Sequence, residues 1–159
     1  MADMGERGRI SVHMRCAWLL ALAPSVVARL VRTMLLSSPC PELAIDVYIV
    51  RDGAMARYNY RHMGCAGPTN ILSFPACAAL RFGSQRSALS VPADAATLIL
   101  SADTARREAF LYGQDLEEYT VWLLAHGMGH LLGYDHGVAM DTVCARFYAA
   151  ARQELGLLQ

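Results

Sequence analysis

The sequence predicts a single α+β domain over residues 1–159, with a small mixed four-stranded sheet packed with about five helices. A chain of 159 residues is long enough to bury a hydrophobic core of its own. Its composition, 55% hydrophobic and 18% charged, is that of a folded protein and excludes disorder throughout. Segments of strand-like and helical periodicity follow one another with no linker that would divide the chain.

The N-terminal third is expected to contribute two strands and one helix. Residues 10–14 alternate as a strand does, after a flexible terminus over residues 1–9. Pro24 can begin a helix, and apolar residues recur at helical spacing as far as Ser37, where a cluster of serine and proline breaks the pattern. Residues 43–50 alternate in the manner of a half-buried strand.

The middle of the chain is expected to add a short helix and two short strands. Asp52 can cap a helix over residues 52–61, and a glycine-containing turn precedes a strand at residues 70–74. Residues 76–96 have no sustained period and are long for a loop in a compact domain, which indicates a functional or mobile loop. The fourth strand is expected at residues 97–100.

Three helices are expected to complete the chain, at residues 103–113, 115–132 and 138–155. Asp103 and Asp115 stand at the start of the first two, where an aspartate can accept hydrogen bonds from free backbone N–H groups. The resulting order of strands and helices supports the α+β class.

The charges balance overall, with 14 acidic and 14 basic residues, and every basic residue is an arginine. A uniformly basic coat for nucleic acid is therefore excluded, and so is chemistry that needs a lysine nucleophile. The distribution is uneven, because residues 51–107 hold seven arginines and three aspartates, whereas residues 115–154 hold six acidic residues and two arginines. We expect a molecule with one basic and one acidic side.

The cysteines and the N-terminal segment bear on the cellular compartment. Five cysteines with no Cys-x-x-Cys pair indicate reduced thiols in a cytosolic protein. The apolar run at residues 16–23 imitates a secretory signal, but Pro24 directly after the apparent cleavage site favours a segment of the fold. No apolar run reaches the ~18 residues of a membrane-spanning helix, so we expect a cytoplasmic protein with no membrane partner.

Residues 126–136 read HGMGHLLGYDH and carry three of the five histidines. His126 and His130 are four residues apart on the expected helix, so their imidazoles project from one face and can share a metal ion. Gly133 can adopt a positive φ, end the helix and bring His136 to the same ion. Three imidazoles leave a fourth tetrahedral position open, which is typical of catalytic zinc. The sequence predicts one Zn²⁺, or another divalent transition metal, at the C-terminal end of this helix.

Gly127 and Gly129 lie inside the same helix, where each costs about 1 kcal/mol relative to alanine. Two interpretations are open: the missing side chains let a substrate or an edge strand approach the metal, or they allow close packing against another helix. The histidine spacing is also that of the metzincin metalloproteases, which have a glutamate as general base at the position of Gly127. Proteolysis by that mechanism is therefore not expected.

The histidine segment is similar to the signature of the YbeY family of bacterial endoribonucleases, His-Gly-x-x-His-Leu-x-Gly-Tyr-Asp-His. A second block, GPTNILSFP at residues 67–75, is similar to the family's Pro-Thr-Asp/Asn-x-Leu-Ser-Phe-Pro strand. A third block, ILSADTARREA at residues 99–109, is similar to its Ile-Ser-x-Asp-Thr-Ala-x-Arg-Glu-Ala helix start. The resemblance covers residues 42–155, and more faintly the chain from residue 10.

The resemblance implies a zinc-dependent cytosolic endoribonuclease that cuts single-stranded RNA, takes part in maturing the 3′ end of 16S rRNA and works with ribosomal particles. It also implies the three clustered histidines as the metal ligands. The chain departs from the family at Met63, where the family has a functional arginine. Arg61 is our candidate to contact the same phosphate, and a solvated charge at a helix end is the alternative. A family acidic residue is also missing from residues 96–98.

Two functions remain open. In the first, the protein hydrolyses RNA phosphodiester bonds with a metal-activated water, while an arginine stabilises the developing charge and RNA lies on the basic side. No residue is identified as the general base, because Asp135 is more typical of a residue that orients a neighbouring histidine. In the second, the protein is a zinc-stabilised, catalytically weak ribosome-assembly module.

Other candidate side chains are expected to have structural roles. His13 is interpreted as a surface histidine and His62 as a loop histidine, both outside the ligand set. Trp122 lies at helical spacing from apolar neighbours and is expected in the core. Asn70 and Ser73 are expected to support the strand that flanks the site.

Overall fold

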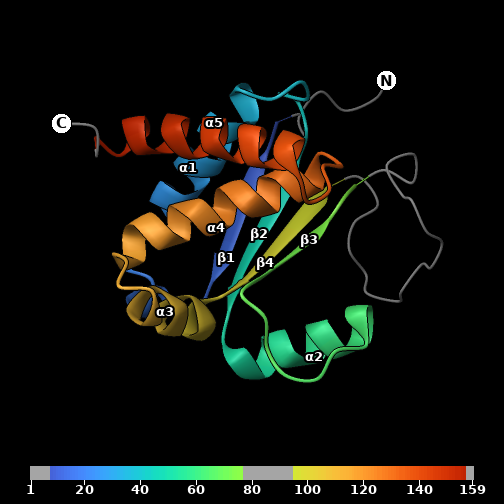
Figure 1. The fold of residues 1–159 in the computed structure, drawn as a ribbon, viewed down its shortest axis with the longest axis vertical. Helices are drawn as coiled ribbons and strands as arrows, with labels where there is room; N and C mark the ends of the chain where they lie inside the picture. The colour runs from blue at the N-terminus through green and yellow to red at the C-terminus, as the bar shows by residue number, and fades with distance from the viewer. Residues whose placement is uncertain (1–7, 77–94, 157–159) are drawn as a thin grey trace.

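The computed structural model describes residues 8–76 and 95–156, which form a four-stranded sheet with helices on both faces (Figure 1). In chain order the elements are β1 (Ile10–Met14), the short 3-10 helix η1 (Ala17–Leu19), α1 (Pro24–Leu36), β2 (Ile45–Val50), α2 (Asp52–Met63), β3 (Ile71–Phe74), β4 (Ala96–Ser101), α3 (Ala102–Leu111), α4 (Leu116–Leu131) and α5 (Val138–Glu154). The predicted α+β class is confirmed. The loop expected at residues 76–96 falls almost entirely outside the described residues.

The sheet has the strand order β1-β2-β4-β3. β1, β2 and β4 run parallel, and β3 runs antiparallel to β4 with Ile71 opposite Leu100, so the sheet is mixed as predicted. All six residues of β4 are buried, which agrees with the apolar sequence of a strand covered on both faces. Among the described strands β3 lies at the edge of the sheet, and it carries part of the second family-like block.

The main core lies between one face of the sheet and the helices α1, α4 and α5 (Figure 1). Ile45, Val47, Leu98 and Leu100 point into it from β2 and β4. A smaller apolar cluster on the other face contains Met55 of α2 together with residues of β3 and β4. α2 and α4 therefore pack on opposite faces of the sheet, with β3 at the edge between them.

The apolar run that imitates a secretory signal belongs to the main core, as expected, since Leu20 and Leu22 are buried there. Backbone hydrogen bonds also hold the two residues before β1. The N–H of Gly8 donates to the carbonyl of Glu42, and the carbonyl of Arg9 accepts from the N–H of Ile45, the first residue of β2. Within the described residues, no helix has both the length and the apolar character needed to cross a bilayer.

The starts of α2 and α3 differ from the sequence prediction. Asp52 does not cap α2, whose N-cap is Arg51. Its carboxylate instead accepts hydrogen bonds from the hydroxyls of Ser101 and Thr104, both at 2.7 Å, where α3 begins. Asp103 in turn accepts from the backbone N–H of Asp52 at 3.0 Å. Each aspartate thus accepts hydrogen bonds from the start of the other helix. This is possible because β2 and β4 are adjacent parallel strands, and α2 and α3 both begin where these strands end.

Candidate metal centre

The three clustered histidines lie at the C-terminal end of α4 and in the loop that follows it. His126 and His130 are on α4, and His136 precedes α5. Gly133 has a φ of 85°, a left-handed conformation that glycine adopts readily, and its N–H donates to the carbonyl of His130 at 3.0 Å. The turn brings His136 back towards the helix, as the sequence predicts.

The side chains of these histidines converge. Nε2 of His126 and Nε2 of His130 are 3.2 Å apart, and one ring nitrogen from each of the three histidines lies within 4.8 Å of the others. Two nitrogens bound to one tetrahedral zinc ion at about 2.0–2.1 Å are roughly 3.3–3.4 Å apart. The separation of His126 and His130 therefore suits two ligands of one ion, and the three imidazoles are a donor set that could hold Zn²⁺ or another divalent transition metal.

Two of the three histidines have an oxygen atom near the ring. Nδ1 of His130 lies 3.0 Å from the carbonyl oxygen of Tyr134, an arrangement in which Nδ1–H donates and Nε2 is left for a metal. Asp135 accepts a hydrogen bond from the backbone N–H of His136 at 3.0 Å, and the same oxygen is 3.6 Å from Nδ1 of that ring. The distance to the ring is too long for a hydrogen bond, so the orienting role expected for Asp135 stays a prediction.

His126 and His130 are half-buried, whereas His136 is exposed. Burial lowers its pKa, and the neighbouring imidazoles of His130 and His136 lower it further. The ring is therefore neutral at pH 7, which is the form that binds a metal ion. Trp122 stacks against this ring with centroids 5.3 Å apart and an angle of 17° between the planes. The prediction that Trp122 lies in the core is wrong, since its side chain is 43% exposed beside the histidine cluster.

Gly127 and Gly129 allow two different close approaches. A Cβ atom on Gly127 would lie 2.6 Å from Cδ1 of Ile71 on β3, and the carbonyl of Gly127 accepts a hydrogen bond from the Ser73 hydroxyl at 2.9 Å. A Cβ atom on Gly129 would lie 2.5 Å from the sulfur of Met140 on α5. Gly129 therefore allows close packing against a neighbouring helix, as the second interpretation holds, and Gly127 admits the edge strand β3 to α4, while its approach to a metal stays a prediction.

The other candidate residues lie on α2 and β3. Arg61 and Met63 are in the last turn of α2, both exposed, and Arg61 makes no hydrogen bond or ion pair with the described part of the chain. His62 is in the same turn, not in a loop as expected, and packs edge-on against Phe74 at 4.8 Å. Asn70 donates to the carboxylate of Glu108 at 3.0 Å, a structural contact as expected.

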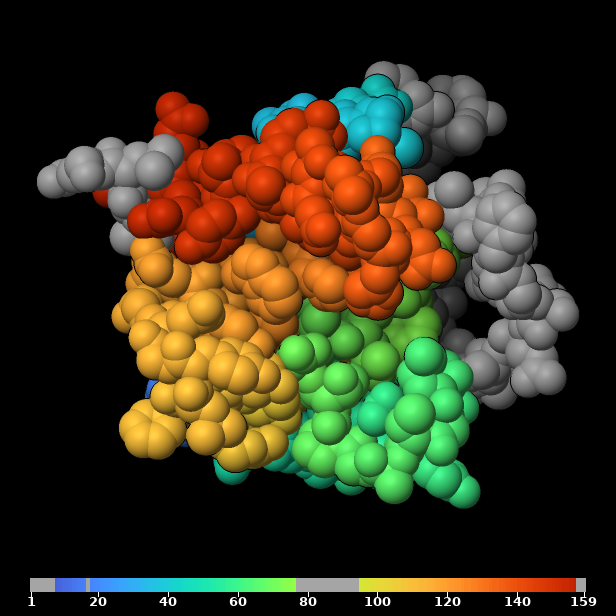
Figure 2. Space-filling view, in the orientation of Figure 1, coloured from blue at the N-terminus to red at the C-terminus, as the bar shows by residue number. Residues whose placement is uncertain are grey.

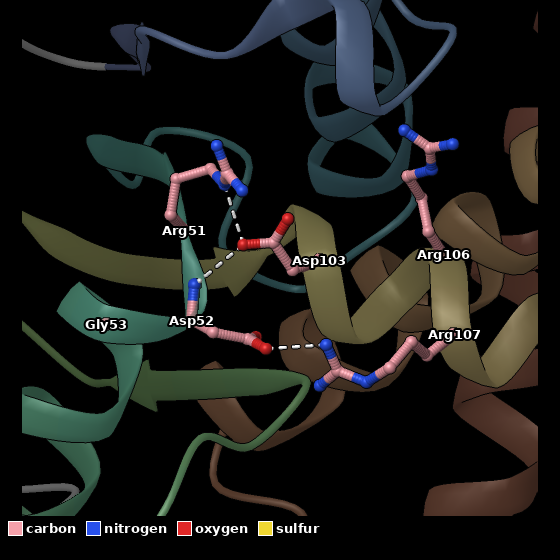
Figure 3. Close-up of a pocket in the computed structure, with 6 residues that line it drawn as sticks. All are labelled: Arg51, Asp52, Gly53, Asp103, Arg106 and Arg107. Atoms are coloured by element: carbon pink, nitrogen blue, oxygen red, sulfur yellow. Dashed lines mark hydrogen bonds and ion pairs between the residues drawn. The ribbon is translucent and has the colours of Figure 1, made fainter.

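A pocket of about 660 Å³ lies away from the histidines, where α2 and α3 begin (Figure 3). Arg51 pairs with Asp103 at 2.7 Å and Arg107 with Asp52 at 2.6 Å. The hydrogen bond from Arg51 lowers the pKa of Asp103. Burial alone would raise the pKa of Asp52, but hydrogen bonds from Arg107 and from the hydroxyls of Ser101 and Thr104 outweigh burial, so this pKa is also lowered. Sequence reasoning missed these pairs because the partners are 52 and 55 residues apart. The lining residues are Arg51, Asp52, Gly53, Asp103, Arg106 and Arg107.

Comparison with known proteins agrees with the histidine signature. A family model described as Endoribonuclease YbeY matches residues 19–145. Endoribonuclease YbeY of Nitratidesulfovibrio vulgaris is 39% identical over 147 residues, which cover 87% of this chain and 88% of the relative. Endoribonuclease YbeY of Oleidesulfovibrio alaskensis is 41% identical over 125 residues, covering 67% and 73%. The fold is similar to the solution structure of TM1509 from Thermotoga maritima, with a TM-score of 0.57, 18% identity and coverage of 92% and 90%.

Proposed function

Because this chain belongs to the YbeY family of endoribonucleases, we propose that it hydrolyses phosphodiester bonds of single-stranded RNA with the help of a metal ion. The proposal includes zinc as the ion, maturation of the 3′ end of 16S rRNA as the task, and ribosomal particles in the cytoplasm as the partners. The observation that carries it is the convergence of three imidazoles, all of which lie within the residues that the family model matches.

His126, His130 and His136 would hold the ion. When bound, it supplies a Lewis acid that polarises a phosphoryl oxygen and lowers the pKa of water towards about 7. The protein's own contribution is orientation, since the carbonyl of Tyr134 fixes the His130 ring with Nε2 facing the other ligands. Asp135 is engaged with the backbone of His136, and we assign it no role as a base.

An RNA strand would run from α4 across the edge strand β3 to α2. Figure 2 supports this path, because α4, the green surface that leads into β3, and α2 lie side by side on one face. Arg57 and Arg61 are exposed on α2 and would bind phosphate, with Arg61 as the candidate substitute for the family arginine. Arg51 and Arg107 contribute less than the sequence charge count predicts, because aspartates neutralise both.

One observation favours a second candidate function. Met63 stands at the position where the family has its functional arginine, and its side chain is 62% exposed. An arginine that would stabilise developing charge on phosphate is therefore missing from this position. A chain that binds zinc and ribosomal particles but cleaves RNA weakly would fit this substitution. The variant Met63→Arg separates the two functions, since a gain in cleavage is expected only if the remaining machinery is catalytic; Met63→Leu is the matched control.

The direct test is cleavage of single-stranded and duplex RNA by zinc-loaded protein. We expect cleavage of the single strand, its loss in His130→Ala, and its retention in His13→Ala, which removes an exposed histidine from β1. Cleavage that survives His130→Ala would overturn the proposed metal-dependent mechanism. Retained zinc and co-sedimentation with ribosomal particles, without cleavage by either wild type or Met63→Arg, would establish the assembly module instead.

A further inference from the structure

Three aromatic rings stack in series along α4 and end at a metal-ligating histidine. Tyr119 and Trp122 have centroids 5.9 Å apart and nearly parallel planes at 13°, and Trp122 and His126 follow at 5.3 Å and 17°. Residues three and four apart on a helix share a face, which explains the order of the rings. The separations are those of favourable offset-stacked pairs. The indole of Trp122 therefore lies between a tyrosine and the imidazole of His126.

The tyrosine end of this stack is firmly held. Tyr119 is 4% exposed, and its hydroxyl donates to Oε2 of Glu108 on α3 at 2.7 Å. The same carboxylate oxygen accepts from the side-chain amide of Asn70, just before β3, at 3.0 Å. Burial and the neighbouring carboxylate both raise the pKa of Tyr119, so the hydroxyl keeps its proton and remains a donor. Trp122 thus rests against a ring that is tied to two other elements.

The three histidines differ in what fixes their rings. A metal-ligating histidine commonly donates its second ring N–H to an oxygen, which sets the orientation of the ring. The carbonyl of Tyr134 provides this oxygen for His130, whereas the exposed Asp135 carboxylate, 3.6 Å from Nδ1 of His136, is beyond hydrogen-bond distance of that ring. Within the described residues, the His126 ring makes a hydrogen bond only through Nε2, to Nε2 of His130. Apart from ring contacts within the histidine cluster, its flat contact with Trp122 is the ring contact that the structure shows for it.

We propose that Trp122 is a positioning residue of the metal centre, whose indole, backed by Tyr119, holds the plane of the His126 ring in place of a hydrogen bond. A metal ion withdraws electron density from a bound imidazole, and an indole face attracts positive charge. The stack should therefore be stronger in the metal-bound protein than in the metal-free protein. The inference rests on the proposed function only in requiring that the three histidines bind a metal ion.

The experiment measures metal binding and makes no use of RNA. Zinc affinity is determined by competition with a chromophoric chelator, and the visible absorption of the cobalt-substituted protein reports the coordination geometry. Removal of an orienting group around a metal site typically weakens binding about 10–100-fold. We expect a loss in that range, with an altered cobalt spectrum, for Trp122→Ala and Trp122→Leu. Trp122→Phe keeps a planar ring and should bind within about threefold of wild type, because aromatic stacking survives.

Trp18 provides the matched control, because it is 75% exposed on η1, and Trp18→Phe should leave both zinc affinity and the cobalt spectrum unchanged. The chain has two tryptophans, so Trp18→Phe leaves Trp122 as the single one. Because Trp122 stacks on His126, the fluorescence emission of this variant should change when zinc binds. Wild-type zinc affinity and an unchanged cobalt spectrum in both Trp122→Ala and Trp122→Leu would overturn the positioning role, even if RNA cleavage were lost. If Trp122→Ala does not fold, the comparison of leucine with phenylalanine decides. Failure of the wild type to bind zinc or cobalt would refute the proposed metal centre itself.

Discussion

Replacing Gly127 by alanine should destabilise the protein, although alanine is the better helix former. The new Cβ atom would lie 2.6 Å from Cδ1 of Ile71 and 2.9 Å from Cδ2 of Leu98, inside van der Waals contact. Overfilling a packed core costs about 1–3 kcal/mol, and two side chains must move here, one β-branched and stiff and the other fully buried. Helix propensity offsets about 1 kcal/mol of this cost. Because two side chains are displaced, we place the packing cost in the upper part of that range, at about 2–3 kcal/mol, which leaves a net loss of about 1–2 kcal/mol in the free energy of unfolding.

Gly129→Ala is the matched control, two residues along the same helix. Its Cβ atom would meet the sulfur and terminal methyl of Met140 at 2.5 and 2.8 Å and the sulfur of Cys144 at 3.3 Å, but the Met140 atoms end a long flexible side chain that can adjust at lower cost than Ile71 and Leu98. The gain in helix propensity, about 1 kcal/mol, should then roughly offset the displacement. The two variants add the same methyl group to the same helix, so their difference reports how closely β3 and β4 pack against α4.

Equilibrium urea unfolding of the metal-free proteins, followed by circular dichroism, measures this difference. A loss of about 1–2 kcal/mol corresponds to a melting temperature roughly 2–8 °C lower for a chain of this size. Gly127→Ala should also loosen the hydrogen bond from Ser73 to the carbonyl of residue 127. Equal stability of Gly127→Ala and Gly129→Ala would refute the reasoning, because it would mean that Ile71 and Leu98 yield as easily as Met140.

Two further predictions concern helix starts. Burial would raise the pKa of Asp52, but hydrogen bonds, including that from Arg107, outweigh burial and lower it. The Asp52 carboxylate therefore stabilises the fold above its pKa of about 4 in the unfolded chain, and this stabilisation is lost as the pH falls through its lower pKa in the folded protein. Thermal melts from pH 6 to pH 3 should fall less steeply for Asp52→Asn than for wild type, and parallel curves would contradict this. Asp115 caps α4 by accepting from two backbone N–H groups at 2.8 and 3.1 Å, so Asp115→Ala should cost about 0.5–2 kcal/mol in urea unfolding. Asp115→Ser should recover most of that loss, and an alanine variant as stable as wild type would show that the cap contributes nothing.

Periodicity and local chemistry predict most of the fold and the histidine cluster. The helix that begins at Pro24 ends within one residue of the expected position, because a proline start and a serine-rich stop are local signals. The same holds for the convergence of the three histidines, since the spacing of His126 and His130 and the turn at Gly133 are set within a few residues of one another. Features that depend on short sequence separations can therefore be predicted from the amino-acid sequence alone.

Features that depend on distant partners cannot be predicted in this way. Asp52 has the sequence context of an ordinary helix cap, and its actual partner Ser101 is 49 residues away on the next parallel strand. Helical spacing puts Trp122 on one face with Tyr119 and His126, but it does not say whether another element covers that face. α4 is apolar on most sides, so its sequence does not distinguish the open face beside the metal site from the buried ones.

All three predicted metal ligands come from residues 126–136, so the unfolded chain retains a segment capable of chelation. A bound ion stabilises the folded state only to the extent that it binds the folded chain more tightly than the unfolded one. In the folded chain α4, the turn at Gly133 and the ring of Trp122 hold the imidazoles together, which adds to the affinity for the ion. Unfolding removes this added affinity. The rise in melting temperature with zinc should consequently reach a plateau once the denatured chain also binds, and the height of that plateau measures how far the fold preorganises the ligands.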